Sequence, residues 1–332
     1  MQIPPLQEIM PRLPIEDTGA HKDMKAIIFV TLFLIAVVAT ALIIEYRQNP
    51  QESIAVAQTA AAGSVKDDFA DVTLTAKSAV VLDLKTNKIL FSSNPDVQLP
   101  LASLTKVPLA IVVSEVLAPD SVIRMPRDAF SSLGIERLSA GERWSVKNVT
   151  DFTLVASSNQ GAEILASIAE KAIRDRYPEA EERDATLWRM NQLATELGLT
   201  NTYFLNESGL DVSESLSGAY GSSRDMAILF GYAASWYRSV FNGTAQNGII
   251  LEGADGSEKI TVYNTNVAIG DLPGLIMGKT GITDLAGGNL AVVFDAAPAH
   301  PIVAVVLGST RDGRFNDMKI LVERARKAFA QK

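Results

Sequence analysis

The pattern of hydrophobic and polar residues divides the chain into four parts. Residues 1–25 are largely polar, contain proline and show no clear periodicity, so we expect a short disordered cytoplasmic tail. Residues 26–44 form an apolar run without a charged side chain, which is long enough to cross a membrane as a helix. Residues 45–74 are rich in Gln, Ala, Ser and Asp and predict a linker. Periodic apolar segments then continue to the C-terminus, which predicts one folded domain over residues 75–332.

The charges that flank the apolar run predict its orientation. Basic residues precede the run in the tail, at Arg12, Lys22 and Lys25. Only Arg47 follows it closely, so we expect a single-pass protein of the cell membrane with an extracytoplasmic domain. A cleaved signal peptide is the alternative. Its best cleavage site, at residues 55–57, lies well beyond the apolar region, which favours an uncleaved anchor.

The spacing of apolar residues in the domain predicts both strands and helices. Residues 78–84 and 88–93 read as a β-hairpin, and short strand-like runs recur at 275–280, 289–295 and 302–307. Helical spacing is found at 107–117, 146–156, 162–172, 184–197, 224–240 and 314–332. Asp184 is the expected N-cap of one helix and Gly198 its stop signal. Residues 157–161 interrupt the helical pattern, and residues 202–221 resemble a loop.

Composition excludes several classes of function. Hydrophobic residues make up 47% and charged residues 20% of the 332 positions, which is typical of a globular protein with one membrane segment. The net charge of −8 argues against a nucleic-acid partner, because phosphate binding needs a basic surface. The absence of cysteine excludes disulfides, thiolate metal sites and a cysteine nucleophile.

The histidine inventory narrows the possible chemistry further. With His21 and His300 alone, one chain cannot build a three-histidine metal site. A Ser-His-Asp mechanism is also disfavoured. His21 falls in the predicted cytoplasmic tail, and His300 precedes Pro301 in a predicted turn, where we expect a solvated side chain.

Three short motifs carry candidate chemistry. Ser103 and Lys106 lie one helical turn apart on the same face, so an amine of lowered pKa can take the proton of the hydroxyl. Ser157-Ser158-Asn159 falls in the break between two predicted helices, where a hydroxyl and an amide can face a cleft. Lys279-Thr280-Gly281 falls on a predicted strand. Each motif is weak by itself.

In this order the motifs match the three-part signature of penicillin-recognising serine acyl-transfer enzymes. Residues 76–322 resemble the low-molecular-mass D-alanyl-D-alanine carboxypeptidases. The segments that carry the likeness include AKSAVVLDLKTNKILFSSNPDVQLPLASLTK, MNQLATELGLTNTYFLNESGLD, SSRDMAILF, YNTN, GKTGITDLAGGNLAVVF and GSTRDGRFNDMKIL. The resemblance implies an α+β fold of the β-lactamase/transpeptidase type. Its five-stranded antiparallel sheet would be flanked by helices and joined to a mainly helical subdomain.

The chemistry and the resemblance together imply roles for the motif residues. Ser103 would be the nucleophile and Lys106 its base, while Ser157 and Asn159 would relay protons and bind the peptide. Lys279 would add positive charge near the nucleophile. The substrate-binding residues would be Thr280, Gly281, Ile282 and Arg314, with the Arg314 guanidinium receiving a terminal carboxylate. The backbone N–H groups of Ser103 and Ile282 would form the oxyanion hole. No metal or organic cofactor is implied.

The implied function is a membrane-anchored serine D,D-peptidase that acts on peptidoglycan stem peptides. Release of terminal D-Ala is favoured, and β-lactam antibiotics would be acylating inhibitors. A D,D-endopeptidase that cuts cross-links, a serine β-lactamase and a non-catalytic penicillin-binding sensor domain are the alternatives. No Glu-x-x-Leu-Asn segment follows the second motif at the spacing of class A β-lactamases, which disfavours a β-lactamase.

Overall fold

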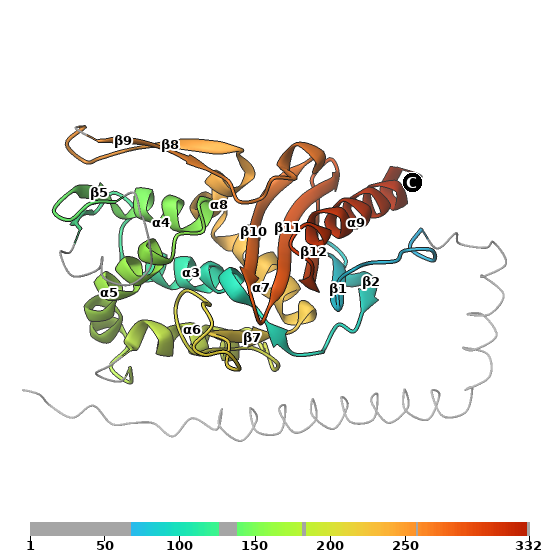
Figure 1. Ribbon diagram of the computed structural model, residues 1–332, viewed down its shortest axis with the longest axis horizontal. Helices are drawn as coiled ribbons and strands as arrows, with labels where there is room; N and C mark the ends of the chain where they lie inside the picture. Colours follow the sequence, from blue (N-terminus) through green and yellow to red (C-terminus); the bar gives the residue numbers. More distant parts are fainter. Residues whose placement is uncertain (1–67, 126–137, 181–183, 257, 331–332) are drawn as a thin grey trace, which may run out of the picture. The chain divides into compact units, whose positions relative to one another are not determined.

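The computed structural model describes residues 68–125, 138–180, 184–256 and 258–330 (Figure 1). Residues 67–332 form a compact unit, which is described here by itself. The predicted tail and membrane span, residues 1–25 and 26–44, lie outside the described residues, as does most of the predicted linker. In the described ranges no helix is both long enough and apolar enough to cross a membrane.

The centre of the domain is a five-stranded antiparallel sheet, as the sequence predicted. Its order is β10-β11-β12-β1-β2. The strands are β1 (Ser78–Asp83), β2 (Lys88–Ser93), β10 (Leu275–Thr283), β11 (Gly287–Ala297) and β12 (His300–Ser309). The predicted hairpin of β1 and β2 is confirmed, and the three later strands are longer than their apolar runs.

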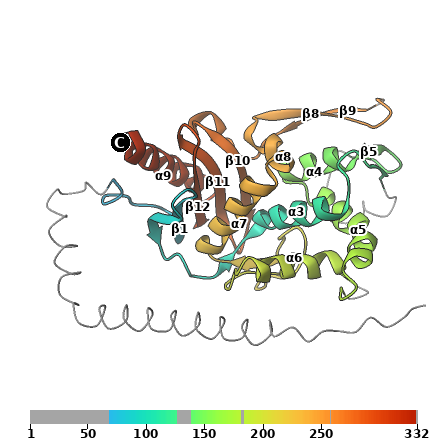
Figure 2. The same ribbon diagram turned by 180° about the vertical axis from the view of Figure 1, so that it is seen from behind.

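Both faces of this sheet are buried, each against different helices. On β1, Ala79 and Val81 belong to one apolar cluster, whereas Val80 and Leu82 belong to the other. This alternation follows from the two-residue period of a strand. Helix α9 (Gly313–Ala330) covers the first face, and α7 (Ser223–Trp236) covers the second (Figures 1 and 2). Burial on both faces explains why these strands are continuous apolar runs rather than alternating ones.

A mainly helical region packs beside the sheet, in agreement with the predicted fold. Its α-helices are α3 (Lys106–Val116), α4 (Val146–Val155), α5 (Asn159–Arg176), α6 (Ala185–Glu196) and α8 (Arg238–Phe241). Helix α7 lies between this region and the sheet and contacts both. Short 3₁₀ segments are η1 (Ala102–Thr105), η2 (Asn242–Ala245) and η3 (Ile269–Asp271). Helix α3 is buried continuously from its first residue to Val113, because α5, α6 and α4 all pack against it. Its sequence is accordingly apolar on every side.

Several short strands have no clear counterpart in the sequence pattern. They are β3 (Leu99–Pro100), β6 (Tyr203–Phe204) and β7 (Ala219–Gly221) in one small sheet, β4 (Val122–Arg124) with β5 (Arg143–Ser145), and β8 (Gly248–Glu252) with β9 (Lys259–Tyr263). Two of them fall within residues 202–221, which the pattern assigned to a loop. Strands of two or three residues are too short to show a period.

Two predictions about helix ends need correction. Asp184 occupies the N-cap position of α6, but its backbone is left-handed and its side chain makes no capping bond. Glu170 of α5 accepts the free N–H groups of Ala185 and Thr186 instead, at 3.1 and 3.0 Å. The predicted break at 157–161 is shorter than expected, because α5 begins at Asn159. Gly198 does end α6, with φ of +69°.

His300 is not the solvated turn residue that the sequence predicted. It begins strand β12, and its Nε2 lies 3.0 Å from Oδ1 of Asp83. Its ring packs on Phe329 of α9 with centroids 4.2 Å apart. His300 therefore helps to attach the last turns of α9 to the sheet, because its ring contacts both elements.

Asp317 of α9 ties the start of the domain to its final helix. Its carboxylate accepts the backbone N–H groups of Thr75 and Ala76, both at 2.9 Å, and the Ser309 hydroxyl at 2.7 Å. Asp317 is 2% exposed, so these hydrogen bonds replace the water that its charge loses on burial.

Candidate active site

Ser103 lies on a tight turn that is wedged between a strand and a loop. The turn is η1, in which Ala102 has a positive φ of 49° and both neighbours of Ser103 are buried. A Cβ at Gly281 of β10 would lie 2.8 Å from the Leu101 carbonyl oxygen and 3.2 Å from the Ser103 nitrogen. A Cβ at Gly209 would lie 2.0 Å from the Ala102 carbonyl oxygen. Glycine at both positions therefore lets backbone approach the turn closely.

Lys106 begins α3 directly beneath this turn. Its Nζ is 2.9 Å from the Ser103 hydroxyl, 2.8 Å from Oδ1 of Asn159 and 2.8 Å from the Ser208 carbonyl oxygen. The side chain is fully buried. These contacts keep the amine aligned with the hydroxyl, so deprotonated Lys106 can accept the Ser103 proton without moving.

Ser157 and Lys279 form a second hydroxyl–amine pair. Ser157 has a left-handed backbone, with φ of 60°, in the short break between α4 and α5. Lys279 projects from β10 and donates to the Ser157 hydroxyl at 2.7 Å and to the Thr280 carbonyl at 2.9 Å. Burial holds the pKa of Lys279 well below its usual value of 10.5, and the neighbouring charges of Lys106 and Arg314 lower it further.

Arg314 reaches the same region from the first turn of α9. Its Nη1 donates to the Gly281 carbonyl oxygen at 2.6 Å, and its guanidinium lies 4.6 Å from the centre of the Phe315 ring. Burial, assisted by Arg311 and opposed by Asp312, lowers the pKa of Arg314 to about 10. Its Nε is buried without a partner among the described residues.

The predicted site residues therefore come together, although they arise from four separate stretches of the chain. Ser103, Lys106 and Asn159 form one connected group, and Ser157 connects to Lys279 of β10. Thr280, Gly281 and Ile282 follow Lys279 on the same strand. Arg314 contacts the Gly281 carbonyl.

Three basic side chains, Lys106, Lys279 and Arg314, meet in this region. Within the described part of the chain, neither Lys279 nor Arg314 forms an ion pair with a carboxylate. A buried cation without an anion is costly, so a bound carboxylate would be favoured here. The site stands in contrast to the chain as a whole, whose net charge is −8.

Two contributors to the site have no assigned role in the sequence analysis. The Ser208 carbonyl is a partner of Lys106, and backbone atoms carry no residue-specific signal. The Thr265 hydroxyl lies 2.6 Å from that of Thr280, and the Thr265 N–H donates to the Val155 carbonyl at 3.2 Å. Thr265 thus joins the end of α4 to β10. Its segment, YNTN, was part of the family likeness, but spacing alone did not indicate this contact.

Comparison with known families agrees with this geometry. Residues 62–311 match the family model described as D-alanyl-D-alanine carboxypeptidase. The chain belongs to this family. The matched residues include the Ser-x-x-Lys, Ser-x-Asn and Lys-Thr-Gly motifs. Arg314 lies three residues beyond the end of the match.

The relatives include proteins named carboxypeptidases and proteins named endopeptidases. D-alanyl-D-alanine carboxypeptidase DacF of Bacillus subtilis is 31% identical over 246 residues, covering 67% of this chain and 58% of the relative. The chain thus spans less than two thirds of that protein. A D-alanyl-D-alanine endopeptidase of Escherichia coli is 27% identical over 279 residues, covering 83% of this chain and 82% of the relative.

Solved structures confirm the fold. Penicillin-binding protein D2 of Listeria monocytogenes, in a cefotaxime-bound form, is 26% identical with a TM-score of 0.63. The match covers 77% of this chain and 98% of that chain. A D-alanyl-D-alanine carboxypeptidase of Mycobacterium tuberculosis gives a TM-score of 0.66 at 22% identity, covering 78% of this chain and 92% of that one. The predicted β-lactamase/transpeptidase-like architecture is therefore correct.

The lowered pKa of Lys279 predicts a pH-dependent stability difference for Lys279→Met. Between the folded-state pKa and 10.5, the unfolded chain binds more protons at this lysine than the folded chain does. Rising pH therefore stabilises the unmodified protein, by at most about 1.4 kcal/mol per pH unit. We expect the Met variant to be the more stable protein at the lower end of this window, and its advantage to shrink toward pH 10.5.

Urea unfolding of the full chain in detergent, followed by circular dichroism from pH 6 to pH 10.5, measures this difference. Lys171→Met is the matched control, because the Lys171 side chain is 82% exposed. Its unfolding free energy should differ from that of the unmodified chain by the same amount at every pH. An advantage of Lys279→Met that grows with pH would contradict the lowered pKa.

Proposed function

We propose that the chain is a serine D,D-peptidase that acts on peptidoglycan stem peptides through an acyl-enzyme on Ser103. The observation that carries this proposal is the 2.9 Å contact between Nζ of Lys106 and the Ser103 hydroxyl. The same site contains a second hydroxyl–amine pair, in which Lys279 contacts the Ser157 hydroxyl at 2.7 Å. Family membership supports the same chemistry.

The proposed reaction proceeds in two steps. Lys106, once deprotonated, takes the Ser103 proton while Oγ attacks the carbonyl carbon of the penultimate D-Ala. The backbone N–H groups of Ser103 and Ile282 would stabilise the resulting oxyanion. Ser157, which accepts a hydrogen bond from Lys279 at 2.7 Å, would pass its proton to the leaving amine as the peptide bond breaks and would take a replacement from Lys279. Water then attacks the ester and its proton passes to Lys279 through Ser157, while Lys106 returns its proton to Ser103 Oγ and the shortened peptide is released.

The uncompensated cations of the site would bind the substrate carboxylate. Arg314 and Lys279 offer charge, and the Thr280 hydroxyl offers a hydrogen bond, all adjacent to β10. A β-lactam also carries a carboxylate beside its reactive carbonyl. The Listeria protein of similar fold was solved in cefotaxime- and ampicillin-bound forms, which supports β-lactams as acylating inhibitors of this chain.

Release of terminal D-Ala is the favoured reaction, and cleavage of cross-links is the second candidate. One observation supports the second candidate: the Escherichia coli endopeptidase is matched over 82% of its own length, whereas the carboxypeptidase DacF is matched over 58%. The two reactions share the acyl-enzyme and differ in the leaving amine. A D-Ala-terminated pentapeptide and a cross-linked peptide dimer, compared as substrates by mass spectrometry, distinguish them.

Ser103→Ala is expected to abolish acylation. The full chain, mixed with benzylpenicillin, should gain the mass of one drug molecule, whereas Ser103→Ala should gain none. Ser215→Ala is the matched control, because Ser215 lies exposed on a loop. This variant should be acylated on Ser103 like the unmodified chain. A lysine base contributes roughly 10²–10⁴-fold, so Lys106→Ala should slow acylation by this factor.

Other outcomes of the benzylpenicillin experiment separate the alternatives. Intact drug and no adduct on the unmodified chain would refute the acyl-enzyme. Destroyed drug without a lasting adduct would indicate a β-lactamase. A stable adduct without turnover of either peptide substrate would indicate a penicillin-binding sensor domain.

Thr265→Val is expected to weaken substrate binding without removing the nucleophile. Valine keeps the shape of the side chain but leaves the Thr280 hydroxyl without its 2.6 Å partner. The loss of one hydrogen bond, about 1 kcal/mol, should raise KM roughly fivefold and leave kcat nearly unchanged. Thr265→Ser, which retains the hydroxyl, should behave like the unmodified enzyme. Equal kinetics for the Val and Ser variants would exclude this positioning role.

We further propose that residues 26–44 anchor the protein in the cell membrane with the catalytic domain outside. The uncharged apolar run and the basic residues before it support this orientation. The full chain should stay in the membrane pellet after carbonate extraction, and protease added to spheroplasts should degrade its domain. Replacing Leu34 and Ala36 by Asp should release the chain to the soluble fraction. Retention of that variant in the pellet would contradict an anchor at residues 26–44.

A further inference from the structure

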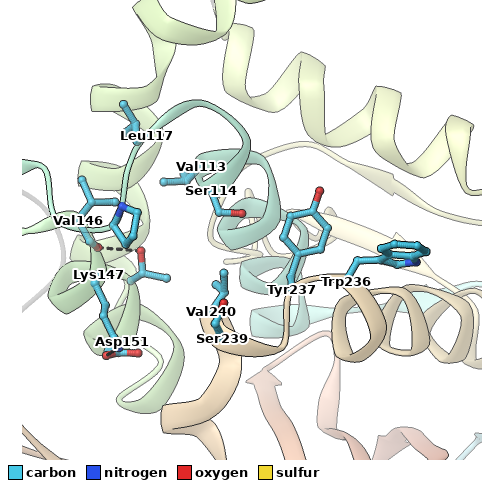
Figure 3. A pocket seen from close by; sticks show the side chains of 12 residues that line it. Val113, Ser114, Leu117, Val146, Lys147, Asp151, Trp236, Tyr237, Ser239 and Val240 are labelled. Carbon is cyan, nitrogen blue, oxygen red and sulfur yellow. Dashed lines mark hydrogen bonds and ion pairs between the residues drawn. The ribbon is translucent and has the colours of Figure 1, made fainter.

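A cavity of about 340 Å³ lies within the helical region (Figure 3). Its walls come from the C-terminal half of α3, the first turns of α4, and residues 236–240, which run from the end of α7 into α8. The lining residues are Val113, Ser114, Leu117, Pro119, Val146, Lys147, Thr150, Asp151, Trp236, Tyr237, Ser239 and Val240. A volume of this size suits a small organic molecule with a single ring.

The cavity is separate from the catalytic groups. Lys106 is the first residue of α3, whereas the cavity is lined by the last turns of that helix. Ser157 follows the C-terminal end of α4, whereas the cavity is lined from its first residue, Val146. None of the proposed catalytic or substrate-binding residues lines the cavity, so the proposed peptidase reaction does not account for it.

Two of the hydroxyl groups that line the cavity present oxygen atoms rather than protons. Ser114 donates its proton to the Ile111 carbonyl at 2.7 Å, and Thr150 donates to the Val146 carbonyl at 2.8 Å. Burial and the neighbouring Tyr232 raise the pKa of Tyr237, so its hydroxyl stays neutral. Each oxygen retains lone pairs, so these groups can accept a hydrogen bond from a ligand.

Asp151 adds a negative charge to these acceptors. It is 6% exposed and its Oδ2 contacts Nζ of Lys147 at 2.5 Å. Burial raises the pKa of Asp151 in spite of this contact, so Lys147 compensates the carboxylate only partly. The Lys147 side chain is 54% exposed and can turn to solvent if another cation takes its place.

We propose that this cavity is a binding site for a small organic cation with an apolar body. The apolar body would contact Val113, Leu117 and Val240, while its N–H groups donate to Asp151 and to the lining hydroxyls. At the rim, Trp236 is 76% exposed, and its ring offers a face to a cation. The proposal does not rest on the peptidase function.

Calorimetric titration of the full chain with benzamidine, a flat aromatic cation, tests the site. We expect one molecule to bind per chain in the millimolar range. Benzoate, which has the same ring and a negative charge, should not bind. Asp151→Asn should weaken benzamidine binding at least tenfold, because the amide retains the shape and loses the charge.

A matched control and a second variant complete the experiment. Asp175 forms the same i,i+4 pair with Lys171 on α5 that Asp151 forms with Lys147 on α4, and it does not line the cavity. Asp175→Asn should bind benzamidine normally. Val240 is half-buried and lines the cavity, so the larger side chain of Val240→Phe should fill the cavity and abolish benzamidine binding. This variant tests the proposal if Asp151→Asn does not fold. Absence of benzamidine binding, or equal binding by the unmodified chain and a folded cavity variant, would overturn the proposal.

Discussion

The burial of two lysine side chains in one site is the constraint on which the rest of the structure depends. Lys106 and Lys279 are almost completely buried, and the neighbouring charge of Lys106 helps to lower the pKa of Lys279. Such burial is tolerable only when nearby oxygens replace water. The Ser103 hydroxyl, the Asn159 amide and the Ser208 carbonyl do so for Lys106. The groups that stabilise the lysines are thus largely the groups that would react with or bind a substrate.

The two-sided sheet makes this arrangement rigid. Strand β10 carries Lys279 at one edge of the sheet, and its Gly281 fits against the turn that bears Ser103. Helix α3 extends from Lys106 through the middle of the helical region, where apolar residues surround it. The positions of both lysines are therefore fixed by extensive packing, and small changes of their surroundings are transmitted to the hydroxyls they contact.

The sequence predicted those parts of the structure that depend on strong local patterns. The apolar strands, the terminal helix and the three motifs were recognisable because burial and chemistry limit the residues allowed there. Contacts that depend on tertiary structure were not. Asp184 is a good capping residue by type, yet Glu170 from another helix takes that role. His300 is paired with Asp83, which lies far away in sequence, and the contact between Thr265 and Thr280 joins the loop after β9 to strand β10.

The attachment of the domain's first residues to α9 has a mechanical consequence. Thr75 and Ala76 donate their backbone N–H groups to Asp317, which lies three residues after Arg314 on the same helix. Residues three apart share one face of a helix and are separated by less than one turn. A pulling force on the polypeptide ahead of residue 68 is therefore borne first by the contacts of Phe69 with Phe91 and of Asp71 with Arg324, and then by the turn of α9 that carries Arg314. Tension that released those first contacts would act on the helix turn that positions the guanidinium beside Gly281.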